Sequence, residues 1–208
     1  AGAPWALYLP FAHTHTPNFC SPKYCNSSKR GRYGDATEEM DGAVGEVVAA
    51  VDALSGGAAN RTLIVFTSDN GPWLKQKLQG GSAGLLRGGK FNTWEGGIRV
   101  PGIARWRGVI APGRTSYARV AAYDLFATVL SLGLGGAANA SAATRARGQY
   151  DGVVDGVDLA PLLRGDVDDE GRALAPGGAA LGALGERCLF HYQGVDVAGF
   201  GPGLWAVR

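Results

Sequence analysis

Hydrophobic residues in the first third of the chain form two short runs with a helical stripe between them. The run at 5–11 is apolar and aromatic, and the run at 62–67 is largely β-branched, so both predict strands. Over 35–54, apolar residues recur at helical spacing and predict an amphipathic helix whose start Asp35 could cap. The expected buried stripe of this helix consists of Met40, Val44, Val47, Val48, Val51 and Leu54. Strand, helix and strand in this order are typical of a largely parallel sheet.

The remaining chain continues the alternation with weaker signals. Apolar spacing predicts a helix over 119–132, and the runs at 189–193 and 204–208 read as strands. A stretch rich in Gly, Ala and Ser at 133–148 is typical of a flexible loop. Because the chain opens just before one predicted strand and stops on another, we interpret it as a fragment of a longer protein.

Composition narrows the class of protein. The chain has 208 residues, is 46% apolar and carries a net charge of +2, which indicates a globular protein and gives no case for nucleic-acid binding. No apolar run approaches the roughly 20 residues that a membrane helix needs. No charged start followed by an apolar segment indicates a signal peptide.

Cysteines and glycosylation sequons bear on the compartment. Cys20 and Cys25 are close enough to form a small local disulfide, and Cys188 could pair with a segment missing from this sequence, although three free thiols remain an alternative. Together with the sequons, a disulfide would favour a secretory, lysosomal or extracellular location. The three Asn-x-Ser/Thr sequons begin at Asn26, Asn60 and Asn139.

Candidate chemistry gathers after the strand predicted at 62–67. Asp69 and Asn70 follow it directly, and ligands of open α/β sheets bind at the carboxyl ends of strands. Their side-chain oxygens are the hard ligands that calcium or magnesium prefers. Lys90 follows two glycines that allow close approach of the backbone, and its ammonium suits an anionic group. These residues predict a divalent cation and an anionic substrate.

Two histidines, His13 and His15, follow the run at 5–11. On an extended segment, residues at i and i+2 point the same way, so the pair is expected to face one side. From residue chemistry alone, a surface pair, a metal-binding clip and a functional histidine all remain open.

Three blocks resemble the sulfatases of the alkaline-phosphatase superfamily, of the arylsulfatase A and galactosamine-6-sulfatase type. The blocks are Ser68-Asp-Asn-Gly71, Leu86-Arg-Gly-Gly-Lys90 and Trp94-Glu-Gly-Gly-Ile-Arg-Val-Pro101, in this order. The resemblance implies an alkaline-phosphatase-like α/β fold with a mixed, mostly parallel sheet flanked by helices. Residues 1–165 would be the C-terminal half of the catalytic domain, and 166–208 would begin a smaller C-terminal α+β domain. A further matching block, Asp155 to Gly165, marks the approach to that domain, and Asp155 and Asp158 are expected to cap a turn and a short helix rather than bind metal.

The resemblance also implies roles for individual residues. Asp69 and Asn70 would hold calcium, although magnesium would also suit their oxygens, and Lys90 would contact the sulfate. His15, two residues before a proline, would contact the sulfate and help protonate the leaving oxygen, a role that suits a side chain titrating near neutrality. The implied substrate is a sulfated small molecule or glycan, and a homo-oligomer is possible.

The nucleophile implied by the resemblance, a formylglycine, is expected outside this sequence together with further metal-binding aspartates. A formylglycine-generating enzyme is therefore an implied partner of the complete protein. Cys20 begins a segment like the family signature Cys-x-Pro-x-Arg, but Tyr24 stands where arginine is needed, so we reject Cys20 as the nucleophile. Glu95 and Arg99 are expected to form a structural ion pair or to bond the loop backbone.

Two alternatives to a sulfatase remain. One is a phosphatase or phosphodiesterase of the same superfamily, because phosphate and sulfate esters share shape and metal requirements. The other is a non-catalytic protein that binds anions or glycans and has lost its nucleophile. The fragment alone is expected to be inactive.

Overall fold

The structure is a computed structural model that describes residues 3–135, 155–176, 180–181, 184–185, 187–193 and 203–207. Two compact units make up the chain. The β1 unit consists of Leu9–Arg107 with Phe190–Arg208, and the α3 unit of Ala1–Tyr8 with Gly108–Leu189. The domain boundary expected after residue 165 stays a prediction.

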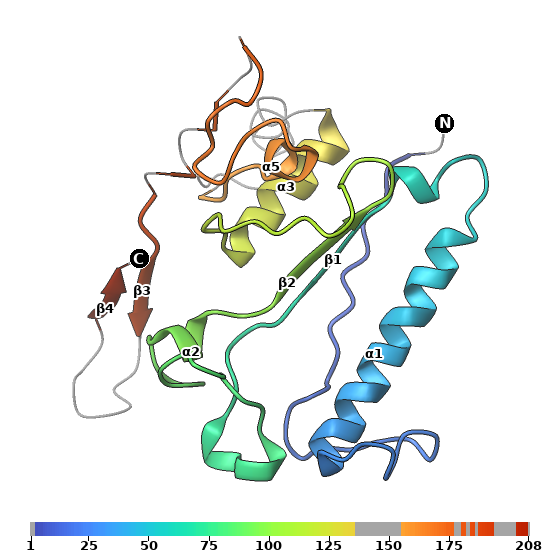
Figure 1. The fold of residues 1–208 in the computed structure, drawn as a ribbon, viewed down its shortest axis with the longest axis vertical. Coiled ribbons are helices and arrows are strands. Elements are labelled where there is room, and N and C mark those ends of the chain that lie inside the picture. Colours follow the sequence, from blue (N-terminus) through green and yellow to red (C-terminus); the bar gives the residue numbers. More distant parts are fainter. Residues whose placement is uncertain are drawn as a thin grey trace. The chain divides into compact units, whose positions relative to one another are not determined.

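Helices and two antiparallel strand pairs form the β1 unit (Figure 1). Strand β1 pairs with β2 from Leu63 opposite Trp106 to Thr67 opposite Gly102, and β3 pairs with β4. The elements are α1 (Gly31–Asp52), η1 (Ala59–Arg61), β1 (Leu63–Thr67), η2 (Leu74–Gln79), α2 (Glu95–Ile98), β2 (Gly102–Trp106), β3 (Phe190–Gln193) and β4 (Gly203–Val207). The strands predicted near 62–67, 189–193 and 204–208 are thus confirmed.

The strand predicted at 5–11 is wrong for this structure. Residues 3–12 belong to no helix or strand, and the side chains of Trp5, Leu7 and Tyr8 are largely exposed. A strand needs a hydrogen-bonded neighbour, which no described segment supplies, and Pro10 has no N–H to donate. Without a strand before α1, the described residues form no βαβ unit, and their strand pairs are antiparallel where a mostly parallel sheet was predicted.

Helix α1 begins earlier than its apolar pattern predicted. Asp35 was expected to cap the helix, but it lies inside and is 1% exposed. Its carboxylate accepts hydrogen bonds from the N–H groups of Asn26 and Ser28, each at 2.9 Å. These bonds, first that from Ser28, lower the pKa of Asp35 below its usual value. Asp35 therefore fastens the preceding loop to the helix instead of capping it.

The predicted stripe of α1 is only partly covered. Val51 is buried, whereas Leu54 lies beyond the helix end and is 42% exposed. The last turn of α1 is tied to β2 by Asp52, which accepts hydrogen bonds from Arg105 Nη2 at 2.7 and 2.8 Å. This pairing, with a smaller effect from Arg107, lowers the pKa of Asp52.

The α3 unit is built around helices α3 (Ala122–Leu134) and α5 (Ala160–Arg164). Its core contains Leu159, Leu162, Val167 and Leu184. Asp158 accepts hydrogen bonds from Ala160 N–H at 2.9 Å and from Ser131 Oγ at 2.5 Å, which confirms its role at the start of α5. Most of the loop predicted at 133–148 lies outside the described residues. The sequon at Asn139 lies outside them as well.

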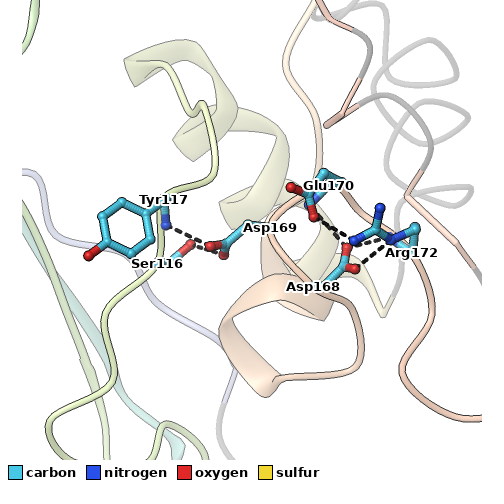
Figure 2. Close-up of polar contacts among 6 residues, drawn as sticks. All are labelled: Ser116, Tyr117, Asp168, Asp169, Glu170 and Arg172. Carbon is cyan, nitrogen blue, oxygen red and sulfur yellow. Dashed lines mark hydrogen bonds and ion pairs between the residues drawn. The ribbon is translucent and has the colours of Figure 1, made fainter.

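Three consecutive carboxylates follow α5, and each accepts hydrogen bonds from a nearby residue (Figure 2). Asp169 accepts hydrogen bonds from Ser116 Oγ at 2.5 Å and from Tyr117 N–H at 2.8 Å. Asp168 binds Arg172 Nε at 2.7 Å, and Glu170 binds the same guanidinium at 2.9 Å. Burial favours the neutral form of Asp168, but the bonds from Arg172 outweigh it and lower its pKa. Each of these carboxylates thus has hydrogen-bond partners among the described residues.

A buried ion pair links α3 to the end of the α3 unit. Asp124 is fully buried and accepts hydrogen bonds from Ala121 N–H at 2.6 Å, Val157 N–H at 2.9 Å and Arg187 Nη1 at 2.7 Å. Burial acts to lower the pKa of Arg187, but its bond to Asp124 outweighs burial and raises that pKa. Tyr123 also accepts a hydrogen bond from this guanidinium at 3.1 Å.

No helix among the described residues is long and apolar enough to span a membrane.

Replacing Asp124 with alanine in the full-length protein should lower the free energy of unfolding by about 3–5 kcal/mol, because it leaves a buried guanidinium without its carboxylate. The matched control is Asp166→Ala, which breaks the solvated pair with Arg164, whose side chains are 43% and 54% exposed. That change should cost about 1 kcal/mol or less. Urea unfolding measures both, and equal losses would contradict the assigned role of Asp124.

Candidate active site

The end of β1 presents two uncommitted side-chain oxygens. Asp69 Oδ1 accepts a hydrogen bond from Asn70 N–H at 2.9 Å, whereas no described residue binds Asp69 Oδ2. Asn70 Nδ2 donates to the Gly71 carbonyl oxygen at 3.0 Å, which orients the amide and leaves its Oδ1 available. Asp69 is exposed and Asn70 half-buried, so both oxygens can reach a ligand.

These two oxygens fit part of a site for a hard divalent cation. Calcium takes about six to eight oxygen ligands, including carboxylates and side-chain amide oxygens. The described residues contain no group of three or more His, Cys, Asp or Glu side chains placed to hold a metal. Asp69 and Asn70 would therefore supply part of the ligand set, with the remainder coming from elsewhere in the complete protein.

Backbone hydrogen bonds join the loop after β1 to the glycine-rich segment around Lys90. Gly71 N–H donates to the Gly97 carbonyl oxygen at 2.9 Å, and Lys90 N–H donates to the Pro72 carbonyl oxygen at 2.8 Å. Each bond engages the chain within three residues of Asp69 and Asn70. The position of Lys90 is thus coupled to the end of β1 through main-chain atoms.

The contact between these two segments leaves no room for side chains. A Cβ on Gly71 would overlap the carbonyl oxygen of Gly96, and a Cβ on Gly96 would overlap that of Gly88. A Cβ on Gly97 would overlap carbonyl oxygens of the segment around Lys90 in the same way. Glycine is required here because backbones approach each other directly. We call Gly71, Gly88, Gly96 and Gly97 the glycine contact.

Lys90 is half-buried against two aromatic rings. Its Nζ lies 5.7 Å from the centroid of the Trp73 ring and 5.5 Å from that of Phe91. Among the described residues no carboxylate forms an ion pair with Lys90. The ammonium is therefore held in place by ring contacts while its charge stays available for an anion.

His15 lies beside the same indole ring. The centroids of the His15 and Trp73 rings are 6.4 Å apart. His15 Nδ1 lies 2.7 Å from the Thr16 carbonyl oxygen, and because a carbonyl only accepts, Nδ1 carries the proton. Nε2 forms no hydrogen bond with the described residues. The structure thus places His15 and Lys90 against one side chain, Trp73, and leaves Nε2 free for a ligand.

His13 has different surroundings, so the prediction that both histidines face one side is wrong. The segment forms a turn, with His15 N–H donating to the Ala12 carbonyl oxygen at 3.0 Å, so the alternation of an extended strand does not apply. The His13 ring packs on Phe19 with centroids 4.7 Å apart, and its Nε2 lies 3.8 Å from Glu39 Oε2. His13 thus packs within its own loop and near α1.

Glu39 anchors the loop that carries these histidines, a role that the sequence analysis missed. Its carboxylate accepts a hydrogen bond from Ser21 N–H at 2.8 Å. That bond, aided by the Ser21 hydroxyl and His13, lowers the pKa of Glu39 below its ordinary value of 4.5. Helical periodicity does not show that the preceding loop folds back onto this side of α1, so it could not reveal the role of Glu39.

The same loop contains a disulfide between Cys20 and Cys25, whose Cα atoms are 5.3 Å apart. The predicted local pairing is confirmed, and the sulfur of Cys20 is not a free thiol that could serve as a nucleophile. Cys188 is free and exposed. The expected pair between Glu95 and Arg99 is also present at 3.8 Å.

Comparison with known proteins gives one family throughout. The family model described as "Sulfatase" matches residues 1–135. The chain is 47% identical to the steryl-sulfatase of Rattus norvegicus over 169 residues, covering 79% of the chain and 27% of the relative. It is 38% identical to the N-acetylgalactosamine-6-sulfatase of Canis lupus familiaris over 195 residues, covering 93% and 32% respectively.

A solved structure agrees with these sequence relatives. The crystal structure of PsFucS1 sulfatase from Pseudoalteromonas sp. matches with a TM-score of 0.63 and 32% identity, covering 85% of this chain and 30% of that one. This match supports the predicted alkaline-phosphatase-like class of fold. The chain spans roughly a quarter to a third of the length of the curated relatives, at 27% and 32% of the two above.

Alanine at Gly71 or Gly96 in the full-length protein should lower the free energy of unfolding by about 1–3 kcal/mol, because the new methyl group overlaps backbone that cannot rotate away. Gly102→Ala is the matched control, since no neighbouring atom lies within 4 Å of a Cβ there. It should change stability by no more than about 0.5 kcal/mol. Thermal unfolding of the three variants checks this, and a Gly71→Ala protein as stable as the control would refute the glycine contact.

Proposed function

Because the chain belongs to the sulfatase family, we propose that the complete protein hydrolyses sulfate esters of aryl or glycan alcohols, with Lys90 and His15 acting on the substrate. The observation that carries this proposal is the Lys90 ammonium, which has no acidic partner among the described residues and lies with His15 against Trp73. A positive charge and a histidine held at one ring form a site for a negatively charged ester.

Lys90 binds the sulfate oxygens and stabilises their charge as the ester bond breaks. A preorganised cation in a partly desolvated site is effective here, since it is already in place when charge shifts. Its main-chain bond to Pro72 keeps it in register with the end of β1. Lysine acts as a point charge, so its three N–H donors can follow the sulfate during the reaction.

His15 donates a proton from Nε2 to the oxygen of the leaving alcohol. Its Nδ1–H remains bonded to the Thr16 carbonyl oxygen at 2.7 Å, which fixes the ring, and in the imidazolium form Nε2 carries the proton that is donated. When the nucleophile's oxygen bonds to sulfur, the bond between sulfur and the ester oxygen breaks, the electron pair stays on the ester oxygen, and the proton from Nε2 neutralises it. The alcohol then leaves uncharged.

Asp69 and Asn70 would hold a calcium ion, or magnesium, through Asp69 Oδ2 and Asn70 Oδ1. Such an ion, when bound, withdraws negative charge from the sulfate oxygens. The nucleophile would be a formylglycine supplied by sequence outside this chain and made by a formylglycine-generating enzyme. The relatives named steryl-sulfatase and N-acetylgalactosamine-6-sulfatase support sulfate esters of ring-containing alcohols as the substrate class.

A secretory, lysosomal or extracellular location forms part of the proposal. The disulfide between Cys20 and Cys25 supports it, because such bonds persist in oxidising compartments. Asn60, which begins a sequon, has an exposed side chain in η1, as a glycan acceptor requires.

The test uses the full-length protein expressed with a formylglycine-generating enzyme and assayed on 4-nitrophenyl sulfate and 4-nitrophenyl phosphate. Sulfate turnover is expected, with kcat/KM reduced about 10²–10³-fold by Lys90→Ala. Asp69→Ala should abolish activity and lower the bound calcium content. Lys75→Ala, an exposed lysine nearby in the sequence, should change kcat/KM less than about twofold.

Other outcomes discriminate between the alternatives. Turnover of the phosphate alone would assign the protein to the phosphatase branch. Anion binding without turnover of either ester would indicate a non-catalytic binding protein. Equal effects of the Lys90 and Lys75 substitutions would remove Lys90 from the site.

A further inference from the structure

Two aromatic residues beside Lys90 form a surface that the proposed chemistry does not use. The rings of Trp73 and Phe91 meet edge to face, with centroids 5.4 Å apart and an interplanar angle of 85°. The Lys90 ammonium lies within 6 Å of both ring centroids, at 5.7 and 5.5 Å. We call Trp73 and Phe91 the aromatic wall.

The wall presents hydrocarbon to its surroundings. Phe91 is 58% exposed, and Trp73 is half-buried. The Trp73 Nε1 atom is buried and has no hydrogen-bond partner among the described residues. Because Nε1 is the one polar atom of the indole, the exposed part of that ring is carbon. An apolar surface thus adjoins a cation that has no carboxylate partner in the described chain.

The backbone of Phe91 is strained. Its φ of 78° lies in the left-handed region, which is unfavourable for residues with a Cβ and suits glycine. The exposed ring gains little from burial to offset this strain. Strained residues of this kind gather at ligand sites. The combination of strain, exposure and contact with Lys90 points to a ligand for the ring.

We infer that the aromatic wall binds the ring of the organic group of the sulfate ester while Lys90 binds its sulfate. This inference rests on the proposed function and adds a determinant of substrate choice to it. In a sulfate ester joined directly to a six-membered ring, the charged group lies next to an apolar ring. The Lys90 ammonium lies next to the aromatic wall in the same way. Aromatic side chains prefer flat ring partners through stacked and edge-to-face contacts, which a flexible alkyl chain does not offer.

The test compares binding of phenyl sulfate and n-hexyl sulfate, which have the same number of carbon atoms. Titration calorimetry uses the full-length protein made without the formylglycine-generating enzyme, so that the ester is not consumed. Phe91→Leu retains apolar volume and removes the aromatic ring. Phe91→Gly removes the side chain and suits the left-handed backbone, so it should fold at least as well as the parent protein.

Both Phe91 substitutions should raise the Kd for phenyl sulfate about three- to tenfold. Phe91→Leu should change the Kd for n-hexyl sulfate less than twofold, on the order of the effect of a surface substitution. Leu85→Ala is the control, because the Leu85 side chain is fully exposed and makes none of these ring contacts. It should leave both constants unchanged.

Unchanged binding of phenyl sulfate in both Phe91 variants, or equal weakening of both esters by Phe91→Leu, would overturn the inference. So would a parent protein that binds neither ester. These outcomes are separate from failure of the proposed function, which appears as absence of sulfate turnover in the formylglycine-containing protein whatever its ring preference.

Discussion

Direct contact between two stretches of backbone determines where the candidate site residues lie. The loop after β1 and the segment around Lys90 meet at glycines, and a side chain at Gly71 or Gly96 would overlap a carbonyl oxygen. Hydrogen bonds from Gly71 N–H and Lys90 N–H connect the same two segments. A contact between main-chain atoms has no side-chain rotamers through which it could relax. It therefore fixes the backbone at Lys90 more tightly than side-chain packing could.

The side chains around this contact are placed to bind a cation and an anion. The strand end leaves Asp69 Oδ2 and Asn70 Oδ1 without partners in the described chain, which suits a hard cation. Trp73, placed just after the contact, lies beside both His15 and Lys90. The proton on His15 Nδ1 is fixed by Thr16, so that Nε2 is the atom available to a substrate. One indole thus lies beside both the histidine and the lysine that we propose act on the substrate.

The parts of this arrangement that local patterns determine were predictable. A β-branched run followed by Asp69 and Asn70 predicts a strand with ligands at its end, and glycines before Lys90 indicate close backbone approach. The helix and the later strands follow from the same periodicities. The role of His15 depended on the family resemblance, because a lone histidine in a loop has no periodic signal.

The predictions that were wrong, and the roles that were missed, depend on contacts that local sequence patterns do not show. The apolar run at 5–11 has strand character, but a strand forms only against a hydrogen-bonded partner, which the described chain does not provide. His13 and His15 diverge because their segment is a turn, and Glu39 is covered by a loop that its helical position does not reveal. Phe91 could have been noted as a bulky residue in a glycine-rich segment, but its left-handed φ is visible only in three dimensions.

The most direct test of the central claim is a crystal structure of the full-length protein with calcium and a bound sulfate. The account predicts that Asp69 Oδ2 and Asn70 Oδ1 lie about 2.3–2.6 Å from the cation. It also predicts Lys90 Nζ at about 2.7–2.9 Å from a sulfate oxygen, with the glycine contact intact. A sulfate bound away from Lys90, or a cation held without Asp69 and Asn70, would contradict it.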